Sequence, residues 1–181
     1  MIRSVVLPAL GAFLVAGQPL RAQDRPALNL VTHSRVRIDR PAAAIWPLIV
    51  EPSAWKQGLQ LSHHAGVNGQ RGQVLAAKDP TTPSAVAFFV ENVEVEINRR
   101  RTIKLFAPEG TLIGFAIWTL EEVAGGTVVG YDVFSETRLD RDRAAAMGAE
   151  GIREAERQAT ESNQKRFDDE LMALKRLVER R

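Results

Sequence analysis

Residues 111–137 read TLIGFAIWTLEEVAGGTVVGYDVFSET, and this stretch decides the fold. Apolar and polar side chains alternate on both sides of the glycine pair, with the period of two that β-strands show. A four-residue loop at 123–126 would join the two strands and place Trp118 opposite Tyr131 on one face. A shift of one residue would mix apolar and polar side chains on each face, so the pattern also fixes the register. We therefore predict a long antiparallel hairpin with one apolar face.

The same period of two extends toward the N-terminus. Turn residues separate further alternating runs, which predict strands near residues 59–64, 73–78, 85–97 and 101–107. A three-residue loop at 98–100 would pair Val95 with Ile103 and set Glu94 opposite Lys104 as a favourable cross-strand pair. The arginines at 99–101 are predicted to form a solvated turn, because three charges fall short of a polybasic site. Strands joined by short turns in this way indicate an antiparallel meander.

Helical segments flank the predicted sheet. A strand at 30–38 precedes a short helix at 42–50, and a second short helical turn is predicted at 52–56. After Leu139 the apolar period changes to 3.6, and Gly148 weakens the helical pattern near its beginning. A long amphipathic helix follows, and its apolar stripe consists of Phe167, Leu171, Leu174 and Val178.

The first residues have the three-part pattern of a secretory signal peptide. Arg3 is followed by the apolar run VVLPALGAFLVAG at 5–17 and by a cleavage region that ends at the small residue Ala22. The run is shorter than the roughly 20 residues that span a bilayer, so an uncleaved anchor is the weaker alternative. We therefore divide the chain into a signal peptide at 1–22, a polar lead-in at 23–29 and a single domain at 30–181.

Removal of the leader would leave a chain without net charge. The sequence has 24 Lys and Arg against 22 Asp and Glu, and the leader holds two of the bases and no acid. The mature chain then has 22 of each, so no overall field attracts nucleic acid. The absence of cysteine excludes disulfides and thiolate chemistry. The three histidines show no metal-ligand spacing, and we expect neither a metal nor another cofactor.

Six short motifs carry a resemblance to a known superfamily. They are SRVRIDRP at 34–41, AIWPL at 44–48, EPSAW at 51–55, WTLE at 118–121, GGT at 125–127 and LKRLVE at 174–179. In these motifs the sequence, over about residues 30–181, resembles the START-related helix-grip superfamily, particularly its SRPBCC or polyketide cyclase/dehydrase-like members. The resemblance implies an α+β helix-grip fold. In that fold an antiparallel curved sheet of about seven strands wraps around a long C-terminal helix, with two short helices after the first strand. The segment at 141–158, between the last strand and the final helix, is longer than the resemblance leads us to expect.

The resemblance also implies a hydrophobic cavity between the sheet and the C-terminal helix. Small residues on the inner face would leave room for a ligand, and aromatic rings would form one wall, although the same rings could simply pack the core. His63 and His64 point to opposite faces of a strand, and parity with Leu61 turns His63 inward. The ligand-binding candidates are Trp55, His63, Gly114, Ala116, Trp118, Tyr131, Phe167 and Leu171.

Three functions remain open. We expect an exported binding protein, secreted or periplasmic, whose partner is a hydrophobic small molecule or lipid and which binds no nucleic acid. After cleavage it would keep no stable membrane anchor. The first alternative is a cyclase/dehydratase- or hydrolase-like enzyme that uses the same cavity, with His63, Tyr131 or an inward-facing arginine as its acid or base. The second is a protein-interaction module of the cell envelope, with an exposed apolar patch at Ala144, Ala145, Met147 and Ile152.

Overall fold

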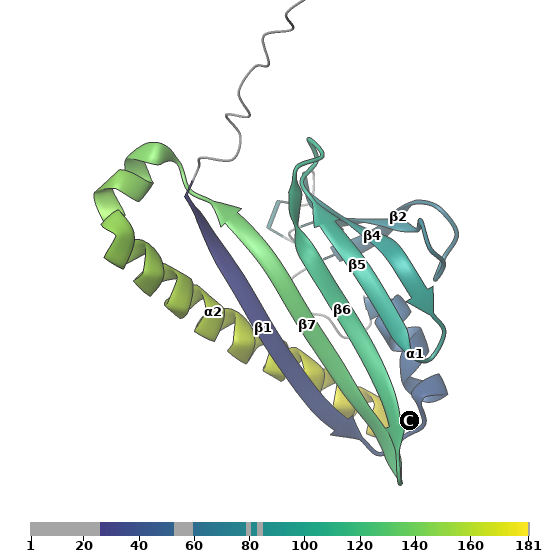
Figure 1. Cartoon of the computed structure of the whole chain (residues 1–181). Coiled ribbons are helices and arrows are strands. Elements are labelled where there is room, and N and C mark those ends of the chain that lie inside the picture. The colour runs from purple at the N-terminus through teal and green to yellow at the C-terminus, as the bar shows by residue number, and fades with distance from the viewer. Residues whose placement is uncertain (1–25, 53–59, 79–80, 83–84, 181) are drawn as a thin grey trace, which may run out of the picture.

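The computed structural model describes residues 26–52, 60–78, 81–82 and 85–180. Within them, seven strands form one antiparallel sheet in the order β1-β7-β6-β5-β4-β3-β2 (Figure 1). The elements are β1 (Ala27–Ile38), α1 (Ala42–Val50), β2 (Gln60–Ala65), β3 (Val74–Lys78), β4 (Val86–Glu96), β5 (Arg100–Phe106), β6 (Leu112–Val123), β7 (Gly126–Arg138) and α2 (Arg141–Glu179). No helix in this part of the chain is long and apolar enough to cross a membrane.

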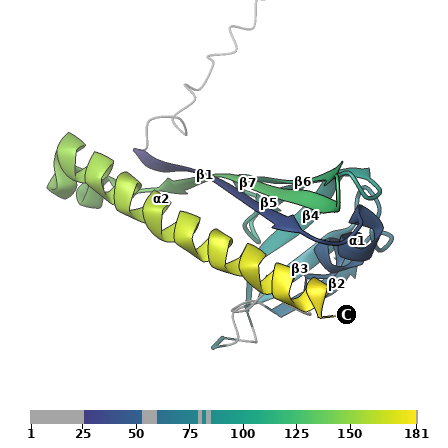
Figure 2. The same cartoon turned by 90° about the horizontal axis from the view of Figure 1, so that it is seen from below.

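The long helix α2 lies against one face of the sheet, as the helix-grip fold requires (Figure 2). The four residues of its predicted apolar stripe are all buried, at 5% exposure or less. They join residues of β1, α1 and the central strands in a single hydrophobic core. The predicted fold class is therefore confirmed. The second short helical turn predicted at 52–56 lies almost wholly outside the described residues.

The hairpin of β6 and β7 has the predicted register. Trp118 pairs with Tyr131, and Ala116 pairs with Val133. The predicted pairing was wrong in the hairpin of β4 and β5, where Glu94 pairs with Thr102 instead of Lys104. The turn occupies residues 97–99, with Asn98 at a φ of 61°, and a bulge between Asn92 and Glu94 shifts the register further. Asparagine tolerates this left-handed conformation, which allows the turn to begin one residue earlier than predicted.

The first turns of α2 differ from the rest of the helix. Asp140 caps it, because its side chain accepts a hydrogen bond of 2.7 Å from the backbone N–H of Arg143. Gly148 has φ and ψ of 63° and 176°, so the predicted interruption divides a short first segment from the long one. Ala144 is buried, and Met147 is half-buried. Of the four residues of the predicted apolar patch, Ala145 is therefore the one that is fully exposed, while Ile152, like Met147, is half-buried.

Candidate functional site

An apolar cavity of about 50 Å³ lies between the sheet and the end of α1, and none of its described lining residues belongs to the C-terminal helix, against which the cavity was predicted. Eleven described residues line it, and ten of them are aliphatic, proline or aromatic. The lining consists of Ile49, Pro52, Leu61, Leu75, Phe88, Val90, Arg101, Ile103, Leu105, Trp118 and Tyr131. An apolar wall with one polar group is typical of small-molecule sites, although such sites usually measure about 300–1,000 Å³.

Strand pairing explains how the lining comes together. Leu75, Val90 and Leu105 are direct cross-strand partners on β3, β4 and β5. Because paired residues of a sheet point to the same face, these three side chains form one row of the wall. A second row runs from Arg101 on β5 through Trp118 on β6 to Tyr131 on β7. Residues far apart in the sequence thus reach one cavity through the register of the sheet.

An aromatic stack connects this cavity to the long helix. The rings of Trp118 and Tyr131 are stacked, with centroids 3.9 Å apart and planes 20° apart. Phe167 of α2 approaches Tyr131 edge-on at 5.2 Å. All three side chains are buried, so the stack belongs both to the hydrophobic core and to the cavity wall. The two alternatives that the sequence left open are therefore not exclusive.

Arg101 is the one charged residue in the described lining, and it is only 2% exposed. Its Nε donates a 2.8 Å hydrogen bond to Asn92 Oδ1, and its Nη1 donates to the carbonyl oxygen of Ile49. Burial lowers the pKa of Arg101 to about 10, while Tyr131 raises it slightly. The prediction of a solvated arginine turn was thus wrong for this residue. The signal in the sequence was parity, because Arg101, Ile103 and Leu105 alternate on one face of a strand.

Two predicted site residues line the cavity, and several others do not. Trp118 and Tyr131 are in the wall. Ala116, Phe167 and Leu171 are buried in the adjoining core, at 0%, 5% and 1% exposure, but they are not among the described lining residues. Of these three, Phe167 supports the wall through its edge-on contact with Tyr131.

Gly114 and His63 are not among the described lining residues. A Cβ at Gly114 would collide with the carbonyl oxygen of Phe134, so this glycine allows close strand packing and provides no space for a ligand. His63 is exposed, and its Nε2 lies 2.8 Å from the carbonyl oxygen of Gly66. His63 pairs with Leu75 of the lining and therefore points to the same face of the sheet, as predicted, but on the edge strand β2 it is exposed and is not among the described lining residues. Trp55 lies outside the described residues.

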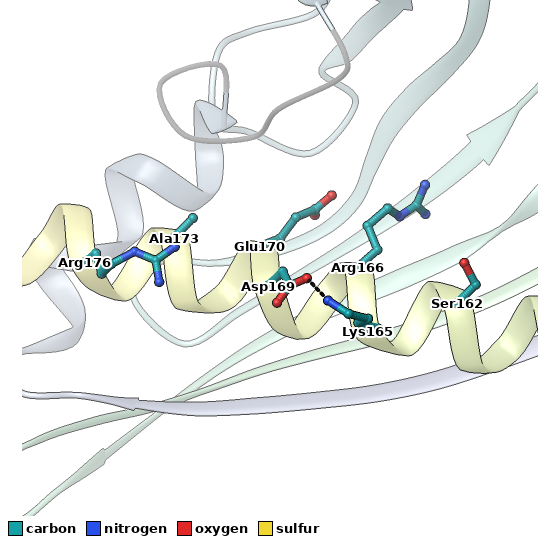
Figure 3. Close-up of a pocket in the computed structure, with 7 residues that line it drawn as sticks. All are labelled: Ser162, Lys165, Arg166, Asp169, Glu170, Ala173 and Arg176. Carbon is teal, nitrogen blue, oxygen red and sulfur yellow. Dashed lines mark hydrogen bonds and ion pairs between the residues drawn. The ribbon is translucent and has the colours of Figure 1, made fainter.

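A larger hollow of about 410 Å³ runs along α2, but its described wall comes from this helix alone (Figure 3). The seven side chains drawn there include five charged ones, among them Lys165 and Asp169, whose charged atoms are 2.7 Å apart. Charged, solvent-facing walls favour water over an apolar ligand. We therefore take the smaller apolar cavity as the candidate site.

A charge cluster lies on the other face of β1 and β7. Asp132 accepts hydrogen bonds of 2.8 and 3.0 Å from Arg35, and its Oδ1 lies 2.9 Å from the His33 Nδ1. Burial raises the pKa of Asp132, but the bonds from Arg35 and His33 outweigh it and lower the pKa overall. Arg35 and His33 are largely exposed, so the cluster is a surface ion pair. The described residues contain no group of three or more potential metal ligands.

Comparisons with known proteins show the fold. No family model matches the chain, and no curated protein matches it. The protein of unknown function SA2116 from Staphylococcus aureus superposes with a TM-score of 0.68 at 8% identity, over 84% of this chain and 95% of that one. The Polyketide_cyc-like protein Cgl2372 from Corynebacterium glutamicum gives a TM-score of 0.56 at 14% identity, over 83% and 92% of the two chains. The di-domain ARO/CYC BexL from the BE-7585A biosynthetic pathway gives 0.55 at 18% identity, over 84% and 49%.

These likenesses place the chain in a class by its architecture. It has the helix-grip fold of SRPBCC and polyketide cyclase-like proteins, as the resemblance in the sequence implied. Identities of 8–18% show a shared fold and are too low to show a shared activity. Function therefore has to be argued from the cavity and its residues.

Proposed function

We propose that this chain is an exported binding protein that holds a hydrophobic small molecule or lipid in the cavity between the sheet and α1. The observation that carries the proposal is the lining, in which ten of eleven described residues are apolar or aromatic. Burial of an apolar ligand against such a wall gains about 25 cal/mol per Å² before ordering costs. The stacked rings of Trp118 and Tyr131 give this wall a flat, rigid section.

The cavity is too small for a whole ligand and would have to widen to take one. A space of about 50 Å³ holds one end of a ligand, and the rest requires the cavity to widen. Ile49 and Pro52 form the wall opposite the sheet and belong to or follow the short helix α1. Movement of this helix would enlarge the site without breaking the sheet, because strand pairing does not involve α1.

Export is the second part of the proposal. It rests on the pattern of residues 1–22, with a basic start, an apolar run and a small residue at the expected cleavage point. N-terminal sequencing of the protein from its own host tests it directly. A mature chain that begins at Gln23 supports export, whereas recovery of the intact leader in the soluble cell extract contradicts it.

Ligand binding is tested by native mass spectrometry of the protein from its own host, followed by analysis of its organic extract. We expect a stoichiometric apolar molecule. Leu105→Trp should abolish its retention by filling the cavity, since Leu105 is part of the lining. Leu112→Trp is the matched control, because Leu112 on the next strand is 46% exposed and lies outside the lining. A ligand-free mass for the unaltered protein, or equal retention by both variants, contradicts the proposal.

A further inference from the structure

Arg101 has hydrogen-bonding capacity that the described chain does not use. A guanidinium carries five N–H donors. One bonds to Asn92 and one to the Ile49 carbonyl, so three N–H groups, one on Nη1 and both on Nη2, have no partner among the described residues. The side chain is 2% exposed and lines the cavity. These three groups are therefore available to an acceptor inside the cavity.

Among the described residues the charge of Arg101 also has no carboxylate partner. Its hydrogen-bond acceptors are an amide and a backbone carbonyl. Its pKa of about 10 still leaves the guanidinium protonated at neutral pH. A buried cation without a counter-charge destabilises a protein, and a bound anion removes that penalty.

A rigid polar network holds the guanidinium in place. The Asn92 side chain donates 3.1 Å hydrogen bonds to Gln73 Oε1 and to the backbone oxygen of Gln70, which directs its own oxygen to Arg101. Asn92 and Gln73 are each 1% exposed. A group held by buried hydrogen bonds on one side, with free donors on the other, is preorganised for a ligand.

We propose that the cavity takes an amphipathic carboxylate, whose oxygens accept the free N–H groups of Arg101 while its hydrocarbon part lies against Leu105 and Trp118. The inference rests on the proposed function and adds the chemistry of the ligand's head group. A carboxylate matches the planar fork of a guanidinium and is the smallest common anion that does so. Water in the cavity would accept the same hydrogen bonds but would leave the charge uncompensated.

Two ligands that differ only in the head group test this inference. Calorimetric titration of the delipidated protein at pH 7 compares octanoate with 1-octanol, and we expect octanoate to bind about tenfold more tightly. Arg101→Met should remove the preference, whereas the matched control Arg100→Met should keep it, because Arg100 is an exposed neighbour on the same strand. Thermal unfolding monitored by circular dichroism verifies that each variant folds.

Each outcome separates the two proposals. Equal binding of octanol and octanoate to the unaltered protein overturns the carboxylate and leaves the hydrophobic site standing. Absence of binding by both ligands overturns the site itself. Octyl phosphate binding more tightly than octanoate also overturns the carboxylate.

If Arg101→Met does not fold, ¹³C NMR of carboxyl-labelled octanoate bound to the unaltered protein tests the pairing with Arg101 instead. A lower carboxyl pKa in the bound state supports pairing with Arg101, and a raised pKa overturns it.

Discussion

Replacement of Val90 by leucine should stabilise the ligand-free protein, because the added methylene enters the cavity. Val90 is 7% exposed, lies on β4 between Leu75 and Leu105, and is part of the cavity wall. A buried methylene is worth about 0.8 kcal/mol. Complete filling of 50 Å³, at about 24 cal/mol per Å³, sets a ceiling of about 1.2 kcal/mol. We therefore expect the free energy of unfolding to rise by about 1 kcal/mol and Tm by roughly 2–4 °C.

Urea denaturation of delipidated protein measures this change. The matched control is Val129→Leu, because Val129 is also a core strand valine but is 0% exposed and does not line the cavity. Overpacking at such a site costs about 1–3 kcal/mol, so the same substitution should have the opposite sign. Val90→Leu should also weaken ligand binding, since ligand and methylene compete for one space. Equal destabilisation by the two variants would refute the reasoning, because it would mean that Val90 faces no free volume.

Three further predictions concern stability. Thr32→Val should raise the free energy of unfolding by about 1 kcal/mol, because the buried Thr32 hydroxyl has no partner in the described part of the chain; a loss in urea denaturation would show that the hydroxyl is bonded. Asp132→Asn should cost about 1 kcal/mol or less at pH 7. Because the pKa of Asp132 is lowered from 3.8, this contribution is present above pH 4 and disappears as the pH falls through the folded-state pKa; a cost that does not change with pH in acid would contradict it. Leu174→Ala should cost about 2–5 kcal/mol, whereas Met172→Ala on the exposed side of α2 should change stability by less than about 0.5 kcal/mol; similar losses at both positions would disprove the assigned helix face.

Local patterns predicted most of the secondary structure and one complete hairpin. The two periods of the sequence, two and 3.6, separate sheet from helix, and both depend only on which side of an element faces the core. The pairing of Trp118 with Tyr131 could be predicted because one slip would expose several apolar residues at once. The pairing of β4 with β5 could not be predicted in this way. A bulge near Asn92 changes the register, so a turn placed at the wrong residues still gives an acceptable alternation of apolar and polar side chains.

The candidate site was only partly predictable. Trp118 and Tyr131 were found because large aromatic residues at inward positions are conspicuous in a strand pattern. The sequence did not predict three further lining residues, Leu75, Val90 and Leu105. Inward-facing aliphatic residues of the meander cannot be told apart in the sequence until the pairing of the strands is known. A small residue on an inner face suggests free space, but Gly114 instead admits the backbone of the adjacent strand.

By itself the sequence determined the α+β architecture, the amphipathic face of the long helix and the register of one hairpin, because these follow from short-range alternation. Tertiary structure alone decided that Arg101 is buried beside a cavity, where it donates hydrogen bonds to Asn92 and Ile49 and pairs with no carboxylate of the described residues. Burial of a charge depends on elements far apart in the chain that close around it, and no local pattern contains that information. The apolar lining of the cavity thus follows from how the strands pair. The burial of Arg101 follows from the packing of α1 against the sheet.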